Sequence, residues 1–407
     1  MIAQDPSTAQ QEGVQATAPF RAWSMVLVIA LCAAVAQAFG RFSYGLILPA
    51  MRDDLGISNA AAGAIGGANV GAYLIGTLAV AWATSRFRLL SVLRFGIVLA
   101  TAGLVGAALS DSALLLGAAL FVAGFGGACV WIPAPMIAAD AVPTPRRGFA
   151  ISLTGTGIGV GVVSASLFAA ALRARFGDDA WNSVYVVEAA TGVLTLLLLL
   201  ALVRHAQAAP SGGGGIGGFG ALQRMRGWRP ILVAYSAFGF MYLLVFGFLT
   251  TRLEDDSGWT SQDAAFAFTL VGCAMVVGGP LFVAVAKRLG VRGALALGFG
   301  LWPLVTAIIW TGAALPTLLA CFALGLLFGG TPLLITMYVV EHTTPTDYGP
   351  AFSAATLAFG VAQMVSPPIG GVIADVSGSF TLVFALSGAT AVLGAGAALR
   401  LPSEPRV

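Results

Sequence analysis

Long apolar stretches, separated at short intervals by charged or turn-forming residues, run through the chain from residue 23 to residue 401. An α-helix rises about 1.5 Å per residue, so about 20 apolar residues are needed to cross roughly 30 Å of hydrocarbon. In lipid, only helices or closed barrels satisfy every backbone polar group. Stretches of this length therefore predict an all-α integral membrane protein with twelve transmembrane helices.

The twelve predicted spans fall into two groups of six. The first six cover residues 23–49, 60–83, 90–109, 113–139, 149–172 and 181–203. The second six cover residues 230–251, 262–286, 292–312, 316–340, 350–374 and 380–401.

Composition agrees with a chain solvated by lipid. Of the 407 residues, 58% are hydrophobic, and only 37 are charged, as 20 Lys or Arg and 17 Asp or Glu. The formal net charge of +3 is too small and too scattered for nucleic-acid binding. Each of the four cysteines lies in an apolar run without metal-ligand spacing, so we expect neither disulfide, metal nor cofactor.

The distribution of Lys and Arg predicts the orientation. Fifteen lie in segments on the same side as the termini, against four, namely Arg52, Arg173, Arg175 and Arg252, on the other side. Cytoplasmic segments carry the excess of basic residues. We therefore expect both termini in the cytoplasm and the protein in the cell inner membrane. Residues 1–20 are interpreted as a disordered cytoplasmic tail, and residues 402–407 as a second tail.

The chain divides near its midpoint. Residues 211–220 are rich in glycine, which predicts a flexible cytoplasmic linker over 204–229 between six-helix bundles at 21–203 and 230–401. The halves also resemble each other at an offset of 201 residues, which aligns Asp140 with Glu341. Duplicated halves are typical of secondary transporters, in which substrate binds between the repeats near the bilayer midplane.

Three motifs carry a family resemblance. They are residues 40–49 (GRFSYGLILP), residues 355–363 (ATLAFGVAQ) and Ala374-Asp375. With the six-plus-six arrangement, they resemble the YbfB-like branch of the major facilitator superfamily over residues 20–401. The resemblance implies a transporter of two pseudo-symmetric bundles. The superfamily's Gly-x-x-x-Asp-Arg-x-Gly-Arg loop signature survives poorly, because Arg86 and Arg88 are present but no Asp precedes them.

Arg41 lies inside the first span, about 12 Å from Pro49 along the helix axis. Gln37, Arg41 and Tyr44 share one face, within about 60° on a helical wheel. A charge in the membrane is costly and marks a candidate functional site. Because a guanidinium matches a carboxylate geometrically, one hypothesis is that Arg41 binds an anionic substrate. The alternative is a structural role, paired with a protein carboxylate or with backbone carbonyls.

Glu188 is the only carboxylate well inside a span. An ionised carboxylate is unfavourable in hydrocarbon, so Glu188 is a candidate for reversible proton binding. The alternative is a glutamate that snorkels or is hydrogen-bonded to a tyrosine.

Further candidates for a substrate site are polar or aromatic residues within spans. Asn69, Tyr73 and Gln363 lie on small-residue faces, where helix packing is the alternative interpretation. Trp131, Tyr235, Tyr242 and Tyr338 could line a cavity for aromatic or amphipathic solutes, or they could fill the bundle core.

The resemblance also implies a cytoplasmic gate. Asp140 and Glu341 end spans four and ten beside basic loops, and superfamily members use such charges as a latch that breaks in each cycle. The predicted gate residues are Arg86, Arg88, Asp140, Arg288, Arg292 and Glu341. The alternative is that these are ordinary solvated charges.

These observations predict a monomeric secondary transporter that works by alternating access in the lipid bilayer. We expect proton coupling and a small organic anion as substrate, aromatic anions among them. The alternative is proton-driven efflux of neutral or cationic drug-like compounds. A membrane enzyme is not expected, because the predicted spans contain no histidine, and no ATP-binding Gly-x-x-x-x-Gly-Lys loop is present.

Overall fold

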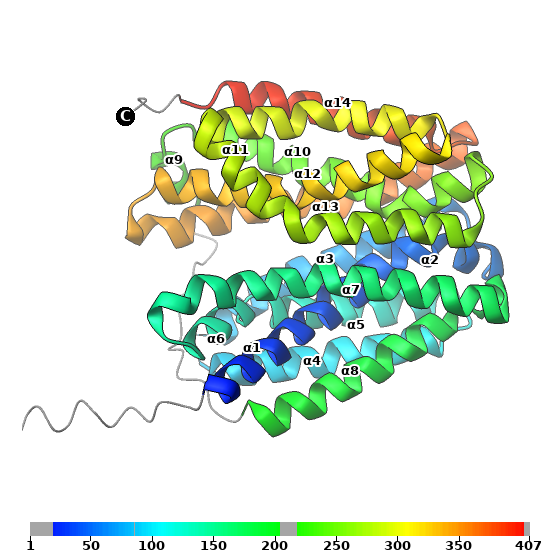
Figure 1. The fold of residues 1–407 in the computed structure, drawn as a ribbon, viewed down its shortest axis with the longest axis horizontal. Coiled ribbons are helices and arrows are strands. Elements are labelled where there is room, and N and C mark those ends of the chain that lie inside the picture. The colour runs from blue at the N-terminus through cyan, green and yellow to red at the C-terminus, as the bar shows by residue number, and fades with distance from the viewer. Residues whose placement is uncertain (1–18, 85, 204–217, 403–407) are drawn as a thin grey trace, which may run out of the picture.

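The computed structural model describes residues 19–84, 86–203 and 218–402, and these residues form helices joined by short connections (Figure 1). Most of the predicted N-terminal tail, residues 204–217 of the predicted linker and residues 403–407 lie outside the described residues. Within the described part no strand is present.

The first half begins with one long helix in three parts. These are α1 (Pro19–Ala33), the π-helix η1 (Ala34–Phe42) and α2 (Ser43–Asp54). The other elements are α3 (Asn59–Ala83), α4 (Leu89–Ala108), α5 (Ala113–Trp131), α6 (Ala134–Asp140), η2 (Thr144–Arg146), α7 (Arg147–Phe176), η3 (Asp178–Ala180) and α8 (Asn182–Leu202).

The second half begins with the short helix α9 (Phe219–Arg224), which lies inside the segment that the sequence assigned to the linker. The elements after it are α10 (Trp228–Thr251), the π-helix η5 (Arg252–Asp256), α11 (Ser261–Trp310), α12 (Ala314–Glu341), α13 (Pro345–Ser377) and α14 (Thr381–Leu399).

Eleven helices among the described residues are long and apolar enough to cross a membrane. One of them, α11, contains 50 residues and changes direction at Gly290, whose φ of 74° and ψ of 163° are not helical. A positive φ is easily adopted by glycine because it has no Cβ. Counting the two arms of α11 separately confirms the twelve-helix fold, with spans eight and nine joined at Gly290.

The first and fourth spans differ from simple predicted helices. Nine residues of the first span are π-helical, which the apolar pattern did not indicate. The fourth span is divided, because α5 ends at Trp131 and α6 begins at Ala134. Pro133 lies at this division and has no backbone N–H to continue the helical hydrogen bonds.

The two halves form two layers that lie against each other (Figure 1). Contacts between them run through three helix pairs, α3 with α13, α7 with α11, and α2 with α10. We call the end of the bundle that contains Pro19 and Pro402 the terminal end. The opposite end, where α2 connects to α3 and α13 to α14, is called the loop end.

Glycines allow α3 and α13 to approach backbone to backbone. A Cβ added at Gly63 would lie 2.2 Å from the carbonyl oxygen of Pro367, and one at Gly371 would lie 2.1 Å from that of Asn59. Both distances are shorter than a van der Waals contact. Small residues at helix crossings let transmembrane helices pack closely, so this seam joins the halves from the loop end inward.

The outer surface of the bundle is apolar. Large hydrophobic side chains are exposed on the spans of both halves, for example Ile75, Phe95, Leu167, Leu194, Leu319 and Leu393. Exposed apolar surface on this scale is unfavourable in water and favourable against lipid tails. The described part of the chain is therefore a multi-pass membrane bundle.

Candidate functional site

Arg41 lies in η1 and borders a small pocket between the two halves. The pocket has a volume of about 30 Å³ and is lined by Arg41, Tyr44 and Asn69 from the first half and by Leu243, Phe246 and Pro367 from the second. A volume of this size holds one or two water molecules. The guanidinium is therefore at the interface on which a transport cycle would act.

Two nitrogens of Arg41, Nε and Nη2, are buried and have no hydrogen-bond partner among the described residues. The guanidinium carbon lies 5.3 Å from the ring centroid of Tyr73, within range of a cation–π interaction. Tyr242 of the second half lies 5.9 Å, between ring centroids, from Phe246, which lines the same pocket. Because buried donors without partners are costly, these nitrogens are well suited to receive an anionic ligand.

Three other polar side chains predicted in the first half are bonded to the backbone of neighbouring helices. Gln37 donates to the carbonyl of Gly127 at 3.2 Å, and the Tyr44 hydroxyl donates to that of Ala62 at 2.6 Å. Asn69 donates to two carbonyls, those of Gly40 at 3.0 Å and Leu120 at 2.7 Å. These bonds favour the packing interpretation for Asn69 and leave Arg41 as the side chain with free donors at the pocket.

The second half contributes a cluster of stacked aromatic rings. Tyr235 stacks on Phe359 at 4.3 Å between centroids, and Tyr242 lies 5.2 Å from Phe238 and 5.0 Å from Phe328. The side-chain amide of Gln363 donates to the Tyr242 hydroxyl. The structure therefore brings together the predicted residues Tyr235, Tyr242 and Gln363.

Three phenylalanines join this aromatic wall, which we define as Tyr235, Phe238, Tyr242, Phe328 and Phe359. Sequence reasoning missed the phenylalanines because it selected only aromatics with a polar atom. A signal was available on α10, where residues 235, 238 and 242 follow the three- and four-residue spacing of one helix face.

Two predicted site residues lie elsewhere. The Tyr338 hydroxyl donates to the backbone carbonyl of Arg226 at 3.1 Å, and its ring stacks on His342 at 4.0 Å, so Tyr338 holds the segment after α9. Trp131 is half-buried at the last residue of α5, beside the break at Pro133.

Glu188 is completely buried within the first half. The hydroxyl of Ser43, two residues after Arg41, donates to Oε1 of its carboxyl group, whereas Oε2 has no partner. The hydroxyl of Tyr185, one turn earlier on α8, is also buried without a partner. Glu188 is thus placed behind the first span and forms no hydrogen bond with Arg41.

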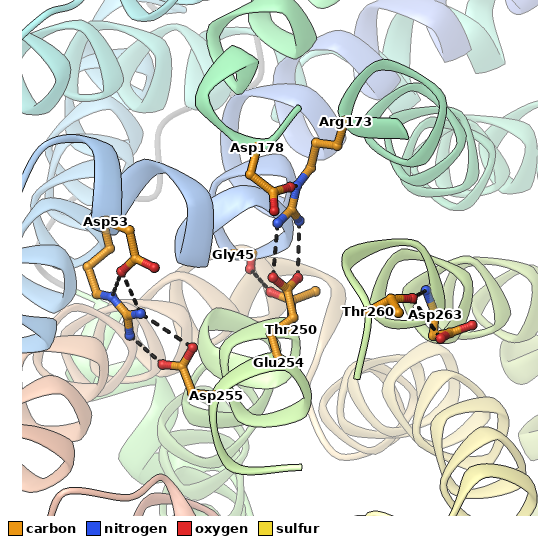
Figure 2. Close-up of polar contacts among 10 residues, drawn as sticks. Gly45, Asp53, Arg173, Asp178, Thr250, Glu254, Asp255, Thr260 and Asp263 are labelled. Atoms are coloured by element: carbon orange, nitrogen blue, oxygen red, sulfur yellow. Dashed lines mark hydrogen bonds and ion pairs between the residues drawn. The ribbon is translucent and has the colours of Figure 1, made fainter. Parts of the chain in front are cut away.

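Charged contacts join the halves at the loop end (Figure 2). Arg173 at the end of α7 donates to both carboxylate oxygens of Glu254 in η5, at 3.0 and 2.9 Å. The side chain of Arg173 is 2% exposed and that of Glu254 is 13% exposed. Arg52 at the end of α2 pairs with Asp255 at 2.5 Å.

Hydrogen bonds to backbone groups reinforce this closure. Asp375 at the end of α13 accepts from the N–H groups of Asn59 at 3.0 Å and Ala60 at 2.8 Å, where α3 begins. A carboxylate at a helix N-terminus satisfies free N–H groups and complements the helix dipole. Thr250 also donates to the carbonyl of Gly45 at 2.5 Å (Figure 2).

The sequence indicated the charges at the loop end but not their partners, because pairing depends on how the halves meet. The residues predicted as a cytoplasmic gate all lie at the terminal end, at the ends of α6 and α12 and in the connections of both halves. Arg86 there lies over the ring of Trp82, at 4.3 Å. Pairing between these residues as a gate stays a prediction.

The sequence is similar to those of known transporters. Residues 33–399 match the family model described as "Uncharacterised MFS-type transporter YbfB". The chain is 28% identical over 273 residues to monocarboxylate transporter 13 of Bos taurus, which covers 63% of this chain and 60% of that protein. It is 26% identical over 262 residues to the uncharacterised MFS-type transporter YfhI of Bacillus subtilis, which covers 62% of each. The matches thus span about three fifths of these curated relatives.

Solved structures show the same fold at low identity. The nucleoside transporter NupG, as a point mutant, superposes with a TM-score of 0.77 at 14% identity over 93% of this chain and 99% of that one. A D-xylose–proton symporter gives 0.71 at 16% identity over 94% and 98%. A bacterial homologue of the lysosomal transporter Spinster, in an inward-facing unoccupied conformation, gives 0.69 at 17% identity over 94% and 96%.

The family model covers most of the chain and the bundle has the corresponding fold; the protein belongs to the YbfB-type family of major facilitator superfamily transporters.

Proposed function

We propose that the protein is a proton-coupled secondary transporter of a small organic anion, aromatic anions among them. The observation that carries this proposal is the guanidinium of Arg41, which borders a pocket between the halves with two buried nitrogens lacking partners. A carboxylate could accept from both nitrogens in a bidentate arrangement. The match to a monocarboxylate transporter is consistent with this substrate class.

The aromatic wall supports a substrate with an apolar or aromatic body. Tyr242 packs against Phe246, and Phe246 lines the pocket together with Arg41, so the charged and aromatic sides of the site adjoin. Aromatic faces favour offset stacking with another ring. A carboxylate held by Arg41 would leave the rest of the molecule against Tyr242 and its stacked neighbours.

Alternating access is supported by the small size of the pocket and by the polar contacts that join the halves at the loop end. The pocket at Arg41 holds only one or two waters, so a substrate enters it only when the walls move apart. The basic-residue census supports a cytoplasmic location for the terminal end. In that orientation the charged contacts at the loop end close the extracellular side of the inner membrane.

The proton site in this proposal is Glu188. Its carboxyl group is completely buried, and no basic side chain among the described residues is bonded to it. Ionisation without a cationic partner is costly in such surroundings. In this proposal, binding and release of a proton at Glu188 couples transport to the proton gradient.

The test is flux into proteoliposomes containing the purified full-length protein. A panel of labelled aromatic and aliphatic carboxylates, together with neutral and cationic dyes, is measured with and without an imposed pH gradient. We expect gradient-dependent flux of at least one carboxylate. Flux of only the dyes would replace this proposal with the efflux alternative, and no gradient dependence would remove the proton coupling.

The role of Arg41 is tested with Arg41→Lys and Arg41→Ala. Lysine keeps the charge but loses the bidentate geometry, so we expect carboxylate flux to fall about tenfold in Arg41→Lys and at least 100-fold in Arg41→Ala. Arg94→Lys is a matched control, since Arg94 donates to the carbonyl of Val203 away from the pocket. Unchanged flux in both Arg41 variants would contradict the assignment.

A further inference from the structure

The π-helix η1 contains Arg41, so the backbone at the candidate anion site has an unusual hydrogen-bond register. It runs over nine residues, Ala34–Phe42, and includes Arg41. Most π-helices are single turns, and they occur frequently at functional sites. At its end the backbone N–H of Ser43 donates to the carbonyl of Ala38, five residues earlier. A return to α-helical bonding would rotate the helix on one side of the change by about 100° per residue of register shift.

The side chain of Ser43 stands between two acceptors at this boundary. Its hydroxyl contacts Oε1 of Glu188, and the carbonyl oxygen of Ala38 lies 3.5 Å from the same Oγ. Ser43 is completely buried. A serine hydroxyl has one proton to donate, so it can satisfy only one of these two acceptors at a time.

Within the described part of the chain, no second side chain competes with Ser43 for a hydrogen bond to Glu188. On its own helix the nearest titratable side chain is Tyr185, one turn earlier, whose hydroxyl is buried without a hydrogen-bond partner among the described residues. The titratable groups on elements that contact α8 are Arg21 and Cys32 on α1, Arg41 on η1, Tyr44, Arg52, Asp53 and Asp54 on α2, Arg94 on α4, Arg147, Arg173 and Arg175 on α7, and Asp178 and Asp179 on η3. Among the described residues, Ser43 is the side chain that hydrogen-bonds to the Glu188 carboxyl group.

We propose that Ser43 is a positioning residue that links the protonation of Glu188 to the π-helical register of the first span, and through it to Arg41. This inference rests on the proposed proton-coupled anion transport and supplies the physical connection between its two sites. It assigns Ser43 no contact with the substrate.

The link operates through the direction of one hydrogen bond. When Glu188 is protonated, its O–H donates to Oγ of Ser43, and the hydroxyl proton of Ser43 is free for the carbonyl of Ala38. This bond reinforces the i to i−5 register. When Glu188 loses its proton to the solvent, the Ser43 hydroxyl turns to the carboxylate, and Ala38 loses the side-chain bond. The serine keeps its own proton in both states.

The experiment is hydrogen–deuterium exchange of the full-length protein in lipid nanodiscs, at acidic and alkaline pH, without substrate. Peptides covering residues 34–43 are followed, and rates are corrected for intrinsic exchange. In the native protein we expect corrected exchange to be at least threefold faster at alkaline pH. Glu188→Gln, whose amide can donate to Ser43 at every pH, should exchange slowly at both.

Ser43→Ala should exchange rapidly at both pH values, and Ser43→Thr, which retains the hydroxyl, should restore the pH dependence. Ser166→Ala is the matched control, because Ser166 is also completely buried and its hydroxyl bonds to Val162 within its own helix. It should behave like the native protein. Native pH dependence in Ser43→Ala, or a Ser43→Thr variant indistinguishable from Ser43→Ala, would overturn the inference.

Failure of this link is distinguishable from failure of the proposed function. Gradient-driven carboxylate flux with an unchanged Ser43→Ala exchange profile would refute the role of Ser43 alone. Conversely, pH-dependent exchange that requires Ser43, in a protein without gradient-driven flux, would retain the link and refute proton-coupled transport.

Discussion

The two ends of the bundle use polar contacts differently. At the loop end, Arg173, Arg52 and Asp375 each reach a partner in the other half. At the terminal end, Arg224 on α9 pairs with Asp347 on α13 at 2.6 Å, and both residues belong to the second half. In the proposed alternating-access cycle, contacts across the halves at the loop end break when that end opens, whereas a contact within one half can persist. The comparison therefore identifies loop-end contacts whose rupture costs free energy when the loop end opens.

Closure of the loop end can be measured as the accessibility of the pocket from that end. Val70 lines the pocket and is 2% exposed. In a Cys273→Ala background, Val70→Cys can be labelled in cells with a membrane-impermeant maleimide. Slow labelling indicates a closed loop end, and the variants below are added to this background.

The largest effect is expected for Arg173→Ala. It leaves the largely buried carboxylate of Glu254 without its bidentate partner, and breaking one side of a buried ion pair costs about 3 kcal/mol or more. We expect labelling of Cys at position 70 to accelerate about 100-fold. The double variant Arg173→Ala, Glu254→Ala should recover part of the slow labelling. Equal rates in the single variant and the parent would show that the pair does not hold the loop end closed.

Gly371→Ala should open the loop end by a smaller factor. The added Cβ would meet the carbonyl oxygen of Asn59 at 2.1 Å, and overpacking of this kind costs about 1–3 kcal/mol. Labelling should accelerate about 10- to 50-fold. Gly396→Ala is the control, because nothing lies within 4 Å of the corresponding Cβ. A similar rate for both variants would argue against close packing at the seam.

Asp375→Asn should have a moderate effect, about fivefold. The amide can still accept a hydrogen bond from the start of α3, but it loses the charge that complements the helix dipole, worth about 1 kcal/mol at most. Salt screens the Asp375 charge and should accelerate labelling of the parent protein. The same salt should accelerate labelling of Asp375→Asn less. A rate equal to that of Arg173→Ala would show that the cap contributes more than dipole interactions allow.

Arg52→Ala should have the smallest effect, twofold or less. Its partner Asp255 is 30% exposed, and ion pairs near water contribute about 0–1 kcal/mol. Arg224→Ala, which removes a pair within one half at the terminal end, should leave labelling unchanged. Acceleration in Arg224→Ala would contradict the distinction between the two ends.

The fold could be predicted because each span must bury about 20 apolar residues, a local property of the sequence. The division at Pro133 and the break at Gly290 also have local signals in proline and glycine. By contrast, the register of η1 depends on what packs against it, and Ser43 gives no sign in the sequence that it meets Glu188.

The candidate site could also be predicted only where its features are local in the sequence. An arginine inside a span is conspicuous, so Arg41 could be singled out from sequence alone. Whether a neighbouring polar group is free is not a local property. Asn69 is a candidate ligand by its position in the sequence, but its amide is occupied by the carbonyls of Gly40 and Leu120. The pairing of Arg173 with Glu254, 81 residues apart, likewise becomes visible only when the halves meet.

The glycine seam between α3 and α13 bears on the speed of the transport cycle. Where main chain meets main chain, as at Gly63 and Gly371, the surfaces can part without any bulky group exchanging staggered conformers. Separation there adds no rotamer-exchange barrier of its own. These two positions should therefore contribute little to the activation energy of turnover.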